Sequence, residues 1–154
     1  MPKVDIAKAQ EVVGSRYPSP FDKPCAARRT RRLGDASGLT QFGVNLLTLQ
    51  PGGWSSQRHW HSHEDEFVYV LQGEVVMVTD QGEEVLAVGD CAGFKAGVPD
   101  GHCLQNRSER DAVILVVGSR HDADYGEYPD IDLKFTAGRY LGKGGFLHKD
   151  GTPY

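Results

Sequence analysis

The chain of 154 residues has few cysteines, and none of them forms a metal-binding or disulfide motif. Cys25, Cys91 and Cys103 are an odd count without Cys-x-x-Cys spacing, which is typical of reduced thiols in a cytoplasmic protein. Long apolar runs are also missing. Residues 1–14 have no apolar stretch long enough for a signal peptide, and no segment approaches the length of a membrane span. We therefore expect a soluble, cytoplasmic protein.

Basic residues are not in excess, because the formal net charge at pH 7 is -4. This balance gives no electrostatic reason to expect nucleic acid or an acidic membrane as partner. The one basic run is 28–32, which holds four arginines. Its simplest interpretation is a solvated or ion-paired surface, with Asp35 close enough to pair. Phosphate binding by clustered arginines is the alternative.

Length and composition favour one all-β domain. A chain of this length can bury a core without disulfide support. Its 19 glycines indicate many tight turns, and short apolar segments alternate with turn signals, which is typical of a sandwich or barrel. The predicted strands are residues 42–47, a strand that carries the histidines, and residues 67–71, 75–78, 85–88, 91–94 and 112–117.

The ends of the chain are less regular, and we expect regular structure to begin near Leu39. Residues 4–13 fit either a short helix capped by Asp5 or a strand-like arm, and the three prolines of residues 17–24 predict an extended loop. The tail is rich in aromatic residues, so we expect it to pack on the barrel or on a second subunit. The predicted organisation is an N-terminal arm and loop (1–38), a barrel (39–118) and a C-terminal tail (119–154).

Residues 59–66 carry the chemistry. His59, His61 and His63 stand at alternate positions, and alternate side chains of a strand point to one face. Two imidazoles could therefore approach one ion, and Glu66 could add an oxygen if the chain bends. This donor set suits zinc, iron, manganese, nickel or copper better than calcium or magnesium. Solvated loop histidines are the alternative interpretation.

The spacing Gly53-x5-His59-x-His61-x4-Glu66-x6-Gly73 resembles the first motif of the cupin superfamily. The resemblance implies an all-β fold, a double-stranded β-helix or jelly-roll cupin barrel, with a metal bound inside it. It also implies that His59, His61 and Glu66 are metal ligands. His63 falls outside the motif and would support a ligand or face the substrate.

The second cupin motif, Gly-x5-Pro-x-Gly-x2-His-x3-Asn, is matched only in part. Gly97 is in register after Gly89, but Asp100 occupies the position of the histidine, and His102-x3-Asn106 keeps the later spacing. A two-residue insertion in the turn explains this, so we predict His102 as the fourth ligand. Asp100 as an oxygen ligand, or no fourth protein ligand, are the alternatives.

Three imidazoles and one carboxylate would leave open positions on a divalent transition metal (zinc, iron, manganese or nickel), as in sites that act on a substrate. Cupins that the chain resembles include sugar-phosphate isomerases, dioxygenases and decarboxylases. We predict a metal-dependent isomerase or oxygenase for a small polar molecule, with His63 or Asp100 as candidate catalytic base. The alternative is a non-catalytic module that binds or senses a small ligand. Edge strands also predict a homodimer.

Overall fold

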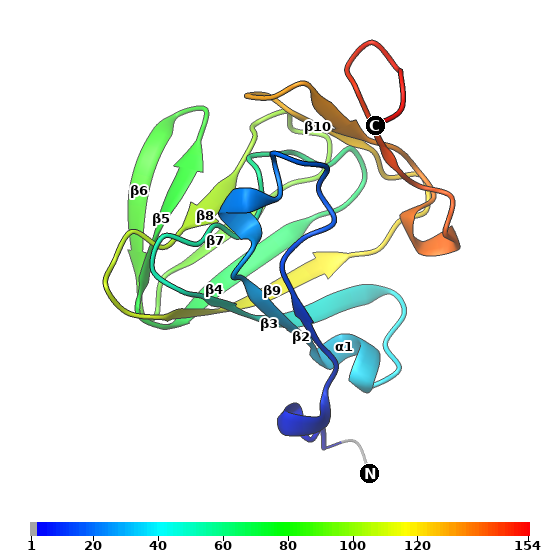
Figure 1. Cartoon of the computed structure of the whole chain (residues 1–154). Helices are drawn as coiled ribbons and strands as arrows, with labels where there is room; N and C mark the ends of the chain where they lie inside the picture. Colours follow the sequence, from blue (N-terminus) through cyan, green and yellow to red (C-terminus); the bar gives the residue numbers. More distant parts are fainter. Residues whose placement is uncertain (1–2) are drawn as a thin grey trace.

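The computed structural model describes residues 3–154, in which nearly all regular structure is β (Figure 1). The largest sheet has six strands in the order β1-β2-β3-β9-β4-β7. Its strands are β1 (Glu11–Val13), β2 (Arg29–Arg32), β3 (Phe42–Leu49), β4 (Glu66–Gln72), β7 (Cys91–Phe94) and β9 (Ala112–Ser119). The predicted all-β fold is confirmed, although the described sheets are not joined into one closed barrel.

Two smaller sheets and a few short helices complete the fold. One sheet has the order β6-β5-β8, and the other has the order β10-β11-β12. Their strands are β5 (Glu74–Thr79), β6 (Gly82–Ala87), β8 (Cys103–Gln105), β10 (Gly126–Tyr128), β11 (Leu133–Phe135) and β12 (Phe146–Leu147). The helices are α1 (Leu33–Ala36) and the 3-10 turns η1 (Ile6–Lys8), η2 (Lys23–Cys25) and η3 (Arg139–Leu141). None of these described helices has the length and apolar character needed to cross a membrane.

Strand β9 lies at the centre of the six-stranded sheet, between β3 and β4, as its continuous apolar sequence predicts. Ile114 of β9 is paired with Leu47 of β3 and with Val70 of β4, and all three side chains are buried. This row faces the sheet β6-β5-β8, because Val75, Leu86 and Leu104 belong to the same core cluster. The main core therefore lies between these two sheets.

The opposite face of the six-stranded sheet is apolar and partly exposed over β3, β9 and β4. Successive side chains of a strand alternate between faces, so the residues between the buried ones point outward. Leu115 is paired with Leu46 on one side and Tyr69 on the other. On β4, Phe67, Tyr69 and Leu71 are 43%, 37% and 45% exposed. No segment described here buries these side chains.

A second core joins the two ends of the chain. Tyr128, Leu133 and Phe135 of β10 and β11 are buried, and Tyr17 and Phe21 of the N-terminal loop pack against them. Gly126 allows this sheet to approach the histidine segment, because a Cβ there would lie 1.9 Å from the carbonyl oxygen of Trp60. The aromatic tail thus packs within its own chain and covers one end of the main core (Figure 1).

The N-terminal arm is more regular than predicted. Asp5 caps a single turn, η1, and its side chain accepts the N–H of Ala7 at 3.1 Å, after which the chain becomes strand β1. The expectation that regular structure begins near Leu39 is wrong, because β2 pairs with β3 through four residues. In β2, Arg29 and Arg31 form ion pairs with Glu11 on one face of the sheet, at 3.5 and 3.0 Å. Thr30 and Arg32 line the cavity on the other.

Candidate metal centre

The histidine segment is not the strand that its alternating pattern predicted. His59 and His102 exchange backbone hydrogen bonds as an isolated bridge, with N–O distances of 3.2 and 2.9 Å. The next residue, Trp60, instead donates its N–H to the carbonyl of Glu127 in the C-terminal tail. Because neighbouring residues bond to different parts of the chain, residues 59–63 form an irregular, well-anchored loop and no regular ladder.

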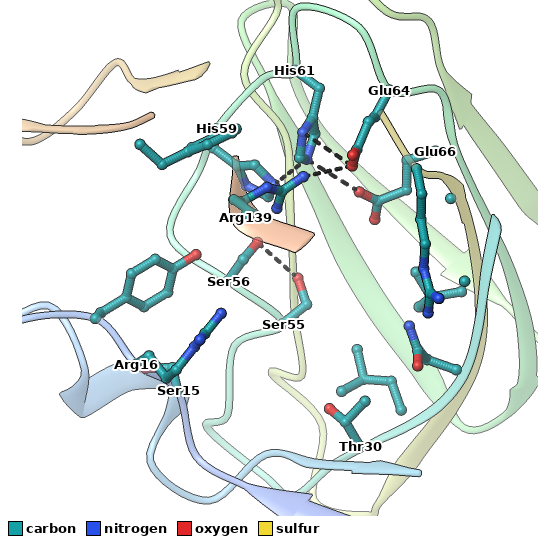
Figure 2. A pocket seen from close by; sticks show the side chains of 18 of the residues that line it. Ser15, Arg16, Thr30, Ser55, Ser56, His59, His61, Glu64, Glu66 and Arg139 are labelled. Atoms are coloured by element: carbon teal, nitrogen blue, oxygen red, sulfur yellow. Dashed lines mark hydrogen bonds and ion pairs between the residues drawn. The ribbon is translucent and has the colours of Figure 1, made fainter. Parts of the chain in front are cut away.

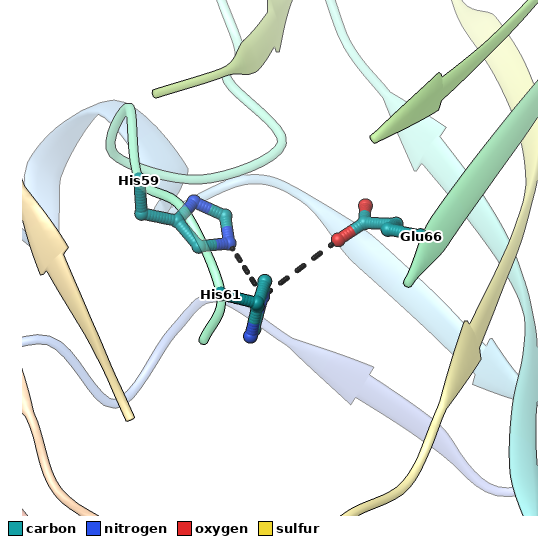
Figure 3. Close-up of side chains that lie close together, drawn as sticks. All are labelled: His59, His61 and Glu66. Carbon is teal, nitrogen blue, oxygen red and sulfur yellow. Dashed lines mark hydrogen bonds and ion pairs between the residues drawn. The ribbon is translucent and has the colours of Figure 1, made fainter. Parts of the chain in front are cut away.

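His59, His61 and Glu66 converge despite this irregular backbone (Figure 3). One ligand atom from each side chain lies within 4.8 Å of the others. The Nε2 atoms of His59 and His61 are 3.1 Å apart, and Oε2 of Glu66 is 3.9 Å from Nε2 of His61. The loop supplies the two imidazoles, and the first residue of β4 supplies the carboxylate. The chain therefore bends between His61 and Glu66, as predicted.

The hydrogen bonds at Nδ1 fix the tautomer of both imidazoles. Nδ1 of His59 is 2.8 Å from the carbonyl oxygen of Gln57, which can only accept, so the proton is assigned to Nδ1. Nδ1 of His61 donates in the same way to Oδ2 of Asp124 at 2.8 Å. In the neutral rings both Nε2 atoms then carry lone pairs that face each other. Burial, together with the charges of His102 and His61, lowers the pKa of His59 to about 3, so this ring is neutral near pH 7.

His102 lies beside these groups and directly precedes strand β8. Its Nε2 is 3.6 Å from Oε2 of Glu66, and Phe94 stacks on its ring with centroids 3.6 Å apart. Both ring nitrogens of His102 are buried and have no hydrogen-bond partner in the described residues. A buried imidazole without a partner is costly, so the nitrogens of His102 are available to bind a water molecule or a metal ion.

Glu66 is surrounded by imidazoles. Burial opposes ionisation of its carboxyl group, but the neighbouring His102, His59 and His61 outweigh this effect and lower its pKa to about 2. Glu66 is therefore a carboxylate over the physiological pH range. The arrangement offers one anionic oxygen and two imidazoles within 4.8 Å of one another, with the imidazole of His102 beside the carboxylate.

The two residues predicted as a catalytic base lie elsewhere. His63 is exposed, its Nδ1 is 2.8 Å from the hydroxyl of Ser62, and its ring stacks on His121. Asp100 accepts the backbone N–H of Asp80 at 2.8 Å. Neither side chain lines the cavity that holds His59 and His61.

Sequence reasoning missed three charged residues next to His61. Glu64 and Asp124 are buried, and Arg139 from η3 donates to both carboxylates, at 2.5 and 2.8 Å. Burial opposes the ionisation of Asp124, but the hydrogen bonds from His61 and from the backbone of His63 lower its pKa. The tail has no motif that would reveal this role, since Asp124 and Arg139 reach the site only through tertiary packing.

The candidate ligands His59, His61, Glu66 and His102, together with Glu64 and Arg139, line one large cavity of about 810 Å³ (Figure 2). Val68 and Val116, from two of the predicted strands, contribute to its apolar wall. Leu47, Leu104 and Phe94 extend this wall, whereas the rim is formed by polar residues of the arm and the tail. The size is suited to a small molecule.

Residues 45–118 match a family model described as the cupin domain. A crystal structure of a cupin-superfamily sugar phosphate isomerase from Silicibacter pomeroyi is 44% identical to this chain, with a TM-score of 0.94. The match covers 99% of this chain and 96% of that protein. The chain therefore belongs to the cupin superfamily. Its fold is accordingly the double-stranded β-helix of these proteins.

Two further solved structures extend the comparison. A putative sugar phosphate isomerase from Acidithiobacillus ferrooxidans is 28% identical, with a TM-score of 0.79 over 96% of this chain and 88% of that protein. A polyketide cyclase from Streptomyces resistomycificus is 22% identical, with a TM-score of 0.61 over 77% of this chain and 79% of that one, and this similarity concerns the fold alone. No significant match is found among functionally curated proteins.

We predict that Asp124→Asn weakens metal binding at this centre by about tenfold or more, because it removes the negative charge behind His61. Zinc(II) titration against a chelating dye measures the affinity, and thermal unfolding checks that the tail stays packed. Asp122→Asn is the matched control, since this exposed residue lies two positions away. An Asp124→Asn variant with unchanged zinc affinity would show that Asp124 does not support the centre.

Proposed function

We propose that this chain is a metal-dependent isomerase that acts on a small sugar phosphate. The observation that carries the proposal is the pair of Nε2 atoms of His59 and His61, 3.1 Å apart with their lone pairs facing each other inside a large cavity. Two such lone pairs repel each other, and a cation shared between them removes the repulsion. Glu66 and the unpartnered His102 complete the donor set that a transition metal prefers.

The proposed ligands are therefore His59, His61, Glu66 and His102. A divalent zinc, iron, manganese or nickel ion held by them would supply a Lewis acid that polarises a carbonyl or hydroxyl oxygen of the substrate. The structure supports His102 over Asp100, because His102 borders the cavity and Asp100 does not. Phe94 supports the ring of His102 by stacking on it.

The chain's other residues orient these ligands and shape the substrate site. Gln57 and Asp124 hold the Nδ1 protons of His59 and His61, so that both Nε2 atoms stay directed at the shared position. Val68 and Val116 present an apolar wall that limits the water next to it. A bound sugar would place its polar groups toward the ligands and the rim.

The substrate class follows from similarity and from charge. The two relatives with 44% and 28% identity both bear the description sugar phosphate isomerase. The cavity is lined by five arginines but only three carboxylates, which favours an anionic substrate. Neither of these two observations favours a dioxygenase. The alternative is a non-catalytic binding module, and the activity measurement below distinguishes it from an isomerase.

We predict that His59→Ala and His61→Ala each lose most of the bound metal, because each removes one of four donors. His102→Ala should weaken zinc(II) binding by at least tenfold for the same reason. Elemental analysis of the purified variants and zinc titration measure both effects.

The controls for these ligand variants are His63→Ala and Asp100→Asn, whose side chains lie outside the cavity. Both should keep the metal content and zinc affinity of the unchanged protein. A His59→Ala or His61→Ala variant that still holds one equivalent of metal would contradict the ligand assignment. If Asp100→Asn binds zinc more weakly than His102→Ala does, Asp100 and not His102 is the fourth ligand.

We predict that the metal-containing protein interconverts at least one aldose phosphate and its ketose phosphate. Proton NMR of a panel of triose, pentose and hexose phosphates in deuterium oxide follows the reaction, with the unphosphorylated sugars as comparison. Turnover should stop in His59→Ala. Saturable binding without turnover would favour the non-catalytic alternative. If the protein neither binds nor converts any sugar phosphate of the panel, the proposed substrate class is wrong.

We also propose that the chain forms a homodimer. The support is the partly exposed apolar face of the six-stranded sheet, with Phe67, Tyr69 and Leu71 near its centre. The tail was also expected to pack on the barrel or on a second subunit, and its aromatic residues pack within the chain. A twofold axis through this face would bury the same apolar patch of both copies.

We predict that light scattering at micromolar concentration gives twice the mass of one chain. Tyr69→Lys should yield a monomer, because it places a charge in the middle of the apolar face. Val85→Lys is the matched control, since Val85 is exposed on β6 of another sheet. A monomeric unchanged protein, or a Tyr69→Lys variant that stays dimeric, would rule out this interface.

A further inference from the structure

Arginine side chains around the cavity differ in how their charge is balanced. Five arginines line it, and three of these have a carboxylate partner. Arg120 and Arg32 share Asp35, the latter at 3.8 Å, and Arg139 is held by the buried carboxylates next to His61. Each of these three guanidinium groups thus has a carboxylate next to it, although Arg120 and Arg32 share a single one.

The other two arginines, Arg16 and Arg28, form no ion pair with a carboxylate anywhere in residues 3–154. Arg28 donates Nε–H to the carbonyl oxygen of Gly14 at 2.9 Å and Nη1–H to the carbonyl oxygen of Ser55. These carbonyls orient its guanidinium group without cancelling its charge. Arg16 is exposed and extends from the N-terminal arm into the cavity (Figure 2).

Hydroxyl groups accompany these two charges. The hydroxyl oxygen of Ser15 is buried and has no hydrogen-bond partner in the described part of the chain. Ser15, Arg16 and Arg28 all line the same cavity, and Thr30 of β2 lines it nearby. Figure 2 shows Ser15, Arg16 and Thr30 on the side of the cavity opposite His61 and Glu66. Two guanidinium groups without a carboxylate partner and one hydroxyl without a hydrogen-bond partner form a donor set that suits a phosphoryl group.

We propose that Arg16 and Arg28, with the hydroxyl of Ser15, form the binding site for the phosphoryl group of the substrate. This deepens the proposed function, on which the identity of the substrate as a sugar phosphate rests. The phosphoryl group would be held by the N-terminal arm, while the other end of the substrate reaches the wall formed by His59, His61 and Glu66. The arm thereby becomes part of the substrate site, and the arginine run supplies one of its members.

The experiment measures binding of inorganic phosphate to the full-length protein with the metal that it retains on purification. Isothermal titration compares the unchanged protein with Arg16→Gln, Arg16→Lys and Arg29→Gln. Arg29 is the matched control, because its removal changes the net charge equally and its side chain pairs with Glu11 on the other face of the sheet. Acetate is titrated in parallel to distinguish a phosphoryl site from a general anion site. Thermal unfolding confirms that each variant is folded.

Arg16→Gln should raise the dissociation constant for phosphate by about tenfold or more, since one of the two charged donor groups of the site is lost. Arg16→Lys should recover part of the affinity, because it keeps the charge without the planar fork. Arg29→Gln should bind phosphate like the unchanged protein. Equal phosphate affinity in Arg16→Gln and the unchanged protein would overturn the proposal, and so would acetate binding as tight as phosphate binding.

This test separates the subsite from the isomerase assignment. Phosphate binding that depends on Arg16, in a protein that turns over no sugar phosphate, would establish the subsite and remove the isomerase. Turnover of a sugar phosphate with a KM that Arg16→Gln leaves unchanged would keep the isomerase and overturn the subsite. If both proposals hold, Arg16→Gln raises KM for the phosphorylated substrate far more than it lowers kcat.

Discussion

The imidazoles of His59 and His61 are held with their Nε2 atoms 3.1 Å apart, and the rest of the site depends on this contact. Neither ring can turn away, because a carbonyl fixes one Nδ1 and a buried carboxylate fixes the other. The two lone pairs are thus directed at one point, where a cation stabilises the arrangement. Glu66 and His102 at the border of this position add an oxygen and a nitrogen donor of the kinds that transition metals bind.

The C-terminal tail is part of the centre. Asp124 and Arg139 come from the tail, and the half-buried Arg139 pairs with the buried carboxylates of Asp124 and Glu64 beside His61. Buried charges lose hydration, so such a group is stable only when every member is paired. Arg139 donates to both carboxylates and therefore ties the tail to the loop that bears the histidines. The close approach of Gly126 to Trp60 brings the tail near enough for this link.

Sequence spacing nominated His59, His61 and Glu66, whose ligand atoms the structure brings together, and His102, which lies beside Glu66. A fixed motif keeps the same residue types at the same intervals whatever the local backbone does. Apolar runs likewise predicted β4, β5, β7 and β9. The strand assigned to the histidines was wrong, since its alternation reflects the spacing of the site and its hydrogen bonds go to several segments. Asp124, Arg139 and Arg16 could not be found from spacing, because packing of the chain ends brings Arg139 and Arg16 to the cavity and Asp124 to His61.

An anomalous-scattering crystal structure of the purified protein, recorded at the absorption edge of the metal identified by fluorescence, tests the central claim most directly. The account predicts one strong peak between the imidazoles of His59 and His61, at about 2.0–2.3 Å from their Nε2 atoms and within coordination distance of Glu66 and His102. A peak located instead between Glu64 and Asp124, or no peak in protein that turns over its substrate, would contradict it.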